Sequence, residues 1–221
     1  MLRRIHGSND HSDVIAALRG LAEVYQAQGR LDEAVTLYDE SLAMERRTLG
    51  GKDHKSVVAC LCCLAKLYAA HGRLEKSTAL YMEALAMLRR IHGNEDHSSV
   101  AALLCRVAQA CMDQGQLAES AALHEESLAM NRRIHGGKDH GSVARSLCSL
   151  AQVYQAQGRL DESTPLHEEA LAMHRRIHGN KDHEDVCVSL DSLAQVYLAQ
   201  GRLGDSASLH EESLAMKRRI H

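Results

Sequence analysis

Bulky aromatic residues and proline are nearly missing from this chain. Of its 221 residues none is tryptophan or phenylalanine, and Pro165 is the only proline. Alanine, leucine, glutamate, glutamine and arginine, which all favour helices, make up much of the sequence. We therefore expect an all-α fold with almost no β-strand.

Long apolar runs and a strong charge imbalance are missing as well. No stretch approaches the roughly 18 uninterrupted apolar residues of a membrane span, and the N-terminus has no signal-peptide pattern. With 26 basic and 29 acidic residues, the formal net charge is only −3, so bulk attraction to nucleic acid or an anionic membrane is not expected. These absences predict a cytoplasmic protein without a nucleic-acid or membrane partner.

The seven cysteines lack the spacing of a disulfide framework, and their number is odd. Three of them, Cys60, Cys62 and Cys63, are close enough in sequence to suggest a metal centre. They lie within one turn of a predicted helix, however, whereas a closed tetrahedral site needs ligands that converge from different directions. We therefore favour reduced thiols over a metal site, and we predict no cofactor.

A unit of 43 residues repeats along the whole chain. Each copy opens with methionine, as in Met130-Asn-Arg-Arg-Ile-His-Gly136 and Met173-His-Arg-Arg-Ile-His-Gly179. The methionines at this interval are Met1, Met44, Met87, Met130, Met173 and Met216. A fixed period of this size is typical of a structural unit that buries its apolar face only against copies of itself.

This period predicts one array over 1–221, an excerpt of a longer array, in which residues 1–6 end a preceding second helix. The repeats are expected at 11–50, 54–93, 97–136, 140–179 and 183–221. Because solenoids need terminal units with a solvated outer face, we expect apolar side chains to be exposed at both ends and to promote end-to-end self-association. These side chains include Val14, Leu18, Leu209 and Leu214.

Each copy contains two amphipathic helices joined by a short turn. The apolar face of the first helix in the first copy comprises Val14, Leu18, Leu21, Ala22 and Tyr25. Alanine stands at the fourth of these steps in every copy, which predicts a close approach of the partner helix. Glycine is expected to end each first helix. The second helices are expected to begin at Leu31, Leu74, Leu117, Leu160 and Leu203.

The second helix is expected to bury two rows of leucines. The first row is Leu37, Leu80, Leu123, Leu166 and Leu209, and the second is Leu42, Leu85, Leu128, Leu171 and Leu214. An aspartate before each next first helix is placed to cap it. These predicted caps are Asp10, Asp53, Asp96, Asp139 and Asp182.

Strings such as Leu150-Ala-Gln-Val-Tyr-Gln-Ala-Gln-Gly-Arg-Leu160 and Leu171-Ala-Met-His-Arg-Arg-Ile-His-Gly179 resemble the tetratricopeptide repeat, in the long form of kinesin light chains and nephrocystin-3-like proteins. The resemblance implies a right-handed α-solenoid of antiparallel helix pairs. It also implies a non-catalytic scaffold. In the family, paired asparagines on the first helix contact the backbone of bound peptides. Here those pairs are Arg19-Gly20, Cys62-Cys63, Cys105-Arg106, Cys148-Ser149 and Asp191-Ser192.

Histidines that recur in the loop before each first helix allow two interpretations. The loop pairs His92 with His97, His135 with His140, and His178 with His183 resemble metal ligands, but each loop has only two histidines. Equivalent loops should also lie about 10 Å apart, so we favour capping and loop packing.

The arginine pairs near the end of each second helix could attract phosphate. No aromatic residues alternate with them to stack on bases, and compensation of the helix dipole and of acidic pairs earlier on those helices is the simpler role. No phosphate-binding loop, nucleophile elbow or zinc-protease signature occurs, so we predict no catalytic residues.

The candidate binding surface is the concave face lined by the first helices, where the copies differ most. Its predicted residues are Arg19, Glu23, Ala59, Cys62, Lys66, Ala102, Cys105, Arg106, Gln109, Arg145, Cys148, Gln152, Asp191 and Gln195. In the middle repeats Lys66, Arg106 and Arg145 have no acidic neighbour on this face, which predicts a locally positive groove.

Two functions remain open from the sequence. The first is a kinesin light chain-like adaptor that holds an extended, acidic peptide segment in its groove and acts as a protein-binding scaffold. The second is a spacer or sensor segment of a larger multidomain protein, for example one that carries an NTPase domain.

Overall fold

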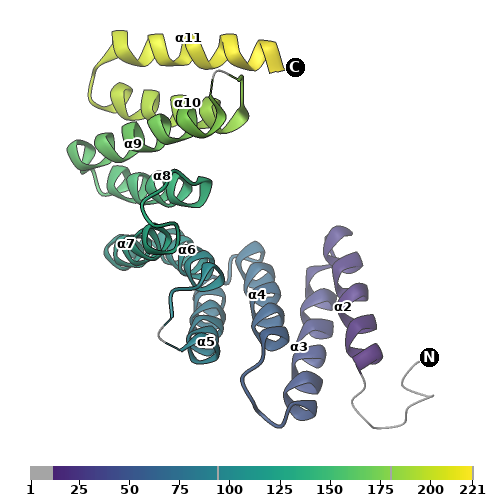
Figure 1. The fold of residues 1–221 in the computed structure, drawn as a ribbon. Coiled ribbons are helices and arrows are strands. Elements are labelled where there is room, and N and C mark those ends of the chain that lie inside the picture. The colour runs from purple at the N-terminus through teal and green to yellow at the C-terminus, as the bar shows by residue number, and fades with distance from the viewer. Residues whose placement is uncertain (1–11, 94, 180, 221) are drawn as a thin grey trace. The chain divides into compact units, whose positions relative to one another are not determined.

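Every secondary-structure element in the described part of the chain is an α-helix. The computed structural model describes residues 12–93, 95–179 and 181–220 (Figure 1). The helices are α2 (Ser12–Ala27), α3 (Leu31–Thr48), α4 (Lys55–Ala70), α5 (Leu74–His92), α6 (Ser98–Asp113), α7 (Leu117–Ile134), α8 (Gly141–Ala156), α9 (Leu160–His178), α10 (Glu184–Ala199) and α11 (Leu203–Ile220). The predicted all-α class is therefore confirmed. None of these helices combines the length and the apolar character that crossing a membrane requires.

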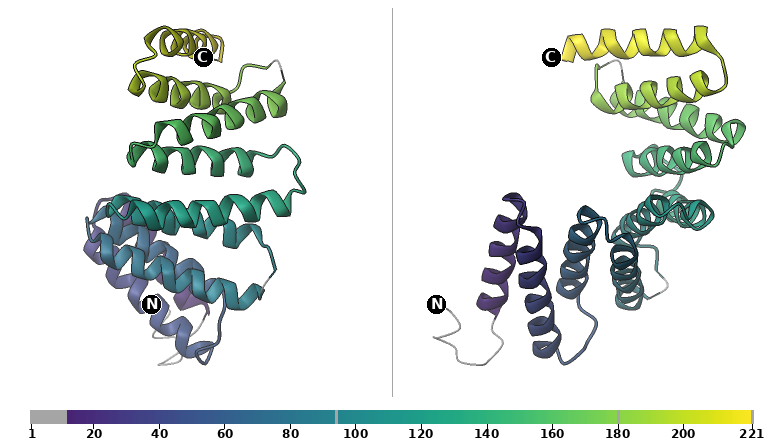
Figure 2. Two further views of the ribbon diagram at one scale, coloured as in Figure 1. Left: turned by 90° about the vertical axis from the view of Figure 1, so that its left-hand side faces the viewer. Right: turned by 180° about the vertical axis from the view of Figure 1, so that it is seen from behind.

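The helices pair into antiparallel hairpins, each made of a first and a second helix, such as α2 with α3 and α6 with α7. The chain divides into two compact units, 1–95 and 96–221. Unit 1 holds α2 to α5, and its two hairpins meet where α3 packs on α4. In unit 2, α7 packs on α8 and α9 on α10, and Figure 2 shows α8 to α11 in successive layers. The segment 1–6 and the predicted cap Asp10 lie outside the described residues.

The turn inside each hairpin depends on a glycine in the left-handed conformation. At Gly29 φ is 74°, and the amide of Arg30 donates to the carbonyl of Tyr25 at 2.9 Å, which closes the end of α2. The second helix then begins two residues after the glycine. This confirms the predicted starts at Leu31, Leu74, Leu117, Leu160 and Leu203.

The buried face of the first helices agrees with the sequence pattern except at one position. The repeated alanine is fully buried in all five first helices, at Ala22, Ala65, Ala108, Ala151 and Ala194. Leu64 of α4 is likewise 0 % exposed, whereas its equivalent Leu21 in α2 is 43 % exposed. In unit 1, α4 packs against both α3 and α5, whereas α2 packs against α3.

The predicted stripe of the second helices is partly wrong. The Leu37 row is only half-buried, and a row of large, deeply buried side chains stands one residue later. That row is Tyr38, Tyr81, His124 and His167. The polar character of tyrosine and histidine concealed these positions, because a search for apolar periodicity gives more weight to the neighbouring leucines.

The predicted aspartate caps are wrong, because histidine occupies the N-cap position. His54 is extended, with φ −147° and ψ 143°, and its Nδ1 accepts a hydrogen bond from the Ser56 amide at 3.2 Å. His97, His140 and His183 cap α6, α8 and α10 in the same way. The capping role that the sequence predicted for the loop histidines is therefore confirmed at these positions.

The displaced aspartates instead bind arginines of the following second helix. Arg90 Nε donates to Asp53 Oδ2 at 2.6 Å and Nη2 to Oδ1 at 2.9 Å. This hydrogen bonding holds the pKa of Asp53 below its usual value. The same bidentate pair recurs as Arg133–Asp96, Arg176–Asp139 and Arg219–Asp182.

In three of the pairs the first arginine bridges successive second helices, as Arg132 does to Glu169 at 2.8 Å. Within unit 1 Arg46 pairs with Glu83, and further along unit 2 Arg175 pairs with Glu212. The sequence placed the acidic partners earlier on the same helix, whereas these contacts join neighbouring repeats. Such carboxylate pairing leaves these arginines less available for phosphate.

Of the four apolar side chains predicted to be exposed at the ends, only Leu214 is exposed, whereas Val14 is buried and Leu18 and Leu209 are half-buried. Helix α11 nevertheless exposes part of the apolar face that is covered in earlier repeats. Leu203 and Leu214 are 64 % and 50 % exposed, although the equivalents of Leu214, such as Leu171, are buried under a following helix. We expect concentration-dependent self-association through this face of α11. Helix α2 of a second copy offers the exposed Leu21 and Val24, and the equivalents of these two residues cover the same face where a first helix follows a second helix within the chain.

Sedimentation of Leu203→Glu/Leu214→Glu should then show a lower average mass than the parent at high micromolar concentration. The control Ser208→Glu, which lies on a different side of α11, should leave the mass unchanged. An identical mass for parent and double variant at every concentration would contradict the expected contact.

Candidate functional site

A cavity of about 350 Å³ lies between α6, the end of α7 and the start of α8. We call it the unit 2 cavity. It is lined by Ser98, Ala101, Ala102, Cys105, Arg106, Asn131, His135, His140, Ser142, Arg145 and Ser146. Residues from three helices meet here because the first helices of two neighbouring repeats pack on the second helix between them.

The charge of the unit 2 cavity is positive. Arg106 of α6 and Arg145 of α8 are both exposed, and neither forms an ion pair with any described residue. No aspartate or glutamate is among the lining residues. Two unpaired guanidinium groups on one concave surface favour an anionic ligand, and carboxylates suit the planar fork of arginine.

Neutral hydrogen bonds form the floor of this cavity. Asn131, which is buried, donates from Nδ2 to Ser146 Oγ at 3.0 Å and so joins α7 to α8. Ser127 Oγ donates to the carbonyl of Ala101 at 2.9 Å and lies 3.0 Å from the thiol sulfur of Cys105. This network fixes the floor without adding a charge that would oppose the arginines.

Two stacked imidazoles form one wall. The rings of His135 and His140 lie 3.5 Å apart between centroids, at an interplanar angle of 10°. Ser142 Oγ is within hydrogen-bond distance of both, 3.0 Å from His135 Nε2 and 2.9 Å from His140 Nδ1. Burial, with a smaller effect from the neighbouring His140, lowers the pKa of His135. A neutral imidazole at this wall can still donate a hydrogen bond to a ligand.

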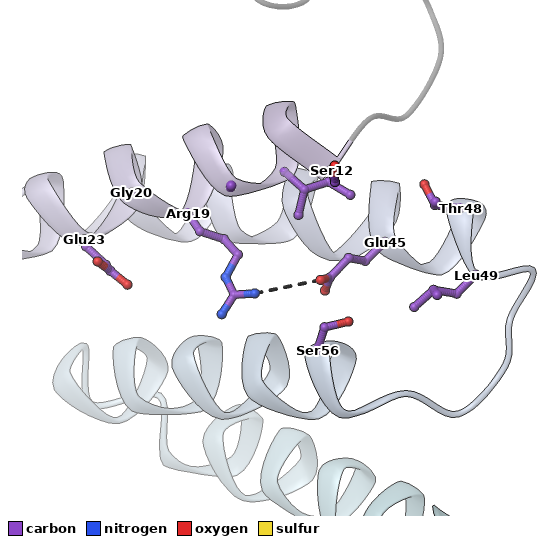
Figure 3. A pocket seen from close by; sticks show the side chains of 10 residues that line it. Ser12, Arg19, Gly20, Glu23, Glu45, Thr48, Leu49 and Ser56 are labelled. Carbon is purple, nitrogen blue, oxygen red and sulfur yellow. Dashed lines mark ion pairs between the residues drawn. The ribbon is translucent and has the colours of Figure 1, made fainter.

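A second cavity, of about 480 Å³, lies at the equivalent place two repeats earlier. We call it the unit 1 cavity. It is lined by Ser12, Ile15, Ala16, Arg19, Gly20, Glu23, Glu45, Thr48, Leu49 and Ser56. Figure 3 shows Arg19 of α2 reaching toward Glu45 of α3, and their Nη1 and Oε1 atoms are 3.8 Å apart. The charged groups that line this cavity are thus the carboxylates of Glu23 and Glu45 and the guanidinium of Arg19.

Six of the fourteen residues predicted for the groove line a cavity, two of them in unit 1 and four in unit 2. Arg19 and Glu23 line the unit 1 cavity, while Ala102, Cys105, Arg106 and Arg145 line the unit 2 cavity. The remaining eight line neither of these two cavities. They are Ala59, Cys62, Lys66, Gln109, Cys148, Gln152, Asp191 and Gln195. Ala59, Lys66, Gln152 and Gln195 are exposed on their first helices, while Cys62 and Cys148 are half-buried.

Two of the predicted groove residues are occupied by neighbours within unit 2. Gln109 donates to Asp113 at 2.8 Å. Asp191 accepts from Lys217 Nζ at 2.6 Å and lies 3.3 Å from His210 Nδ1. Although burial acts to raise the pKa of Asp191, hydrogen bonds from Lys217, Ser213 and His210 together lower it. These contacts make both residues less available to a ligand.

The sequence reasoning missed the residues that the second helices and the loops contribute. Glu45, Asn131 and His174 stand at the same step, directly before the arginine pair, where the other copies have leucine or lysine. Their neighbours scarcely vary between copies, so this variation was a usable signal. It was overlooked because the concave face was assigned to the first helices alone.

One group of described residues places potential metal ligands near one another. One ligand atom each of His178, His183 and Asp185 lies within 4.8 Å of the others. His183 Nδ1, however, already accepts the backbone amide of Asp185 at 3.1 Å as the cap of α10. The rings of His178 and His183 also stack at 3.4 Å, an arrangement in which the two imidazoles do not converge on one point. We therefore assign this group to capping.

Comparison with solved structures shows relatives over nearly the whole chain. A kinesin light chain protein from Podosopora anserina with nearly identical TPR-like repeats is 27 % identical. That match covers 96 % of this chain and 98 % of the other, with a TM-score of 0.80. BtubC (BKLC) from P. vanneervenii shares the fold at 24 % identity and a TM-score of 0.79, over 92 % of this chain and 79 % of that one.

Comparison with sequences leads to the same family. Curated proteins gave no match. A family model described as tetratricopeptide repeat matches residues 13–90, 99–176 and 142–219, which together span most of the chain. The hairpins, the buried alanine at each helix crossing and the kinesin light chain-type neighbours agree with that match. The chain therefore belongs to the tetratricopeptide repeat family.

Proposed function

We propose that the protein is a non-catalytic scaffold that binds an acidic peptide segment at the unit 2 cavity. Tetratricopeptide repeats generally mediate protein–protein interactions. The observation that carries the proposal is the pair of exposed arginines, Arg106 and Arg145, on a concave surface with no lining carboxylate. An aspartate or glutamate side chain would meet both guanidinium groups and the imidazole wall.

Apolar contacts would anchor the same peptide. Ala101, Ala102 and Cys105 lie on the α6 side of the cavity, next to Arg106. The peptide would therefore carry an acidic residue close to a small apolar one. Because the asparagine pairs of the family are absent from the first helices, backbone capture should be weak. We expect a micromolar dissociation constant, which corresponds to a binding free energy on the order of −8 kcal/mol.

Calorimetric titration of blocked acidic and basic peptides tests this proposal. Arg106→Glu/Arg145→Glu should weaken the binding of acidic peptides at least tenfold, because two attractive charges become repulsive. The control Lys181→Glu/Arg218→Glu changes the net charge of unit 2 equally but touches no cavity residue. It should leave the binding within about twofold, as expected for screened, distant charges.

Two outcomes would overturn the proposal. One is a double variant that binds acidic peptides as well as the parent does, and the other is a parent that prefers basic peptides at this cavity. Failure of every peptide to bind would favour the alternative, a spacer or sensor segment of a larger multidomain protein.

A further inference from the structure

The unit 1 cavity has the opposite charge to the unit 2 cavity although it occupies the equivalent place. Gly20 stands where Arg106 does, and Glu45 stands where Asn131 does. Glu23 replaces Gln109 at the same step of the first helix. The charged lining groups of the unit 1 cavity are thus two carboxylates and one guanidinium, which leaves one net negative charge.

Glu45 is a buried carboxylate that the described residues leave incompletely satisfied. It is 7 % exposed, and its Oε2 accepts no hydrogen bond from any of them. Its other oxygen, Oε1, lies 3.8 Å from Arg19 Nη1, which is beyond hydrogen-bond range. A buried carboxylate normally needs several donors, and Arg19 supplies none within hydrogen-bond range, so Glu45 favours a ligand that donates to its carboxylate.

We propose that the unit 1 cavity binds the cationic side chain of a peptide lysine or arginine, held between Glu45 and Glu23. The ammonium or guanidinium group donates to the carboxylates, while Ile15 and Ala16 contact the methylene stem of the side chain. The hydroxyls of Ser12 and Ser56 are further acceptors on the lining. This assignment rests on the proposed function only in taking the ligand to be a peptide.

Nuclear magnetic resonance titration of the full chain with two blocked heptapeptides tests the proposal. One carries lysine at its centre among alanines, and the other carries norleucine there. The lysine peptide should shift the amide signals of Gly20 and Leu49, and the norleucine peptide should bind at least tenfold more weakly. Equal shifts with both peptides would overturn the proposal, because the stem would then bind without the charge.

Two substitutions locate the effect on the carboxylates. Glu45→Gln should weaken binding of the lysine peptide about tenfold, and Glu23→Gln, on the exposed rim, should weaken it severalfold without risk to folding. The matched control Glu75→Gln removes an exposed carboxylate of unit 1 that does not line the cavity, and it should have no effect. Unchanged binding in Glu23→Gln and in Glu45→Gln would overturn the proposal.

An exchange of cavity residues gives a sharper readout. Gly20→Arg/Glu45→Asn gives the unit 1 cavity the residues that the unit 2 cavity has at these two positions, and a Cβ added at Gly20 meets nothing within 4 Å. The variant should lose the lysine peptide and bind a blocked heptapeptide with a central glutamate at this cavity. Retained preference for lysine would contradict the assignment.

The same titrations separate this proposal from the function assigned to unit 2. Arg106→Glu/Arg145→Glu should leave lysine binding at Gly20 and Leu49 intact. If the parent does not bind the acidic peptides, the assignment of the unit 2 cavity alone is contradicted. If the parent does not bind the lysine peptide, the assignment of the unit 1 cavity alone is contradicted.

Discussion

Lowering the pH from 7 to 4 is expected to destabilise the protein by several kcal/mol through His124 and His167. These side chains are 2 % and 0 % exposed, and neither ring nitrogen of either one has a hydrogen-bond partner among the described residues. Burial alone lowers the pKa of each from 6.5 to about 4. The folded protein therefore keeps both imidazoles neutral at a pH where the unfolded chain protonates them.

The sign of the effect follows from proton uptake. Above pH 6.5 both histidines are neutral in the folded and the unfolded chain, so they do not affect the pH dependence there. Between pH 6.5 and about 4 only the unfolded state takes up the protons, and the free energy of unfolding falls as the pH falls. At roughly 1.4 kcal/mol per pKa unit, each histidine removes about 3 kcal/mol.

Urea unfolding followed by circular dichroism across this pH range measures the slope. His124→Tyr/His167→Tyr should flatten the slope of stability against pH, because tyrosine does not protonate in this range. Two other repeats already have tyrosine at the equivalent position, as Tyr38 and Tyr81. The control His210→Tyr changes the equivalent but exposed histidine, which contacts Asp191, and it should change the slope much less than the double substitution does. A parent protein equally stable at pH 7 and pH 4.5 would contradict the prediction.

The carboxylates paired with arginine titrate in a different window. Asp96, Asp139 and Asp182 have a pKa held below the usual 3.8, chiefly by hydrogen bonds from their arginines. Their contribution is present above that value and is lost as the pH falls through the lowered pKa. The histidine effect between pH 6.5 and about 4 is thus separable from theirs.

Leu64→Ala is expected to cost about 2–5 kcal/mol of unfolding free energy, because it deletes a fully buried side chain and leaves a cavity. Leu21→Ala makes the same change at the equivalent step of α2, where the side chain is 43 % exposed, and should cost less than about 1 kcal/mol. Urea unfolding of the two variants and the parent decides the comparison.

Equal destabilisation by the two substitutions would show that α2 packs as closely as α4 does. A loss below 1 kcal/mol in Leu64→Ala would show instead that the core of unit 1 collapses around the deletion. The first result would contradict the burial pattern described for these helices, and the second would contradict the expected cost of the deletion.

Local regularities of the fold could be read from the sequence because they depend on neighbours along the chain. Leu31 and its equivalents begin helices where the pattern placed them, since a glycine two residues earlier adopts a positive φ that other residues disfavour. The alanine at the helix crossing was predictable for a similar reason. Its small size in every copy reports a steric limit that each repeat meets.

The cap and the candidate site were less predictable because they depend on geometry between elements. Asp53 and His54 are adjacent, and either could cap α4. The arginine that binds Asp53 is 37 residues away, and its position decides between them. The contribution of Asn131 to the unit 2 cavity likewise appears only once α7 lies between α6 and α8.

The sequence by itself determined the repeat length, the helix pairs, the buried alanine row and the family, because a repeated local pattern needs only its own copies to fold. The tertiary structure alone decided which equivalent residues differ in environment. Leu21 and Leu64 are the same residue at the same step, as are His210 and His167, yet one member of each pair is exposed and the other is buried. Burial, and with it the pKa of a histidine or the cost of losing a leucine, depends on the helices packed around a side chain.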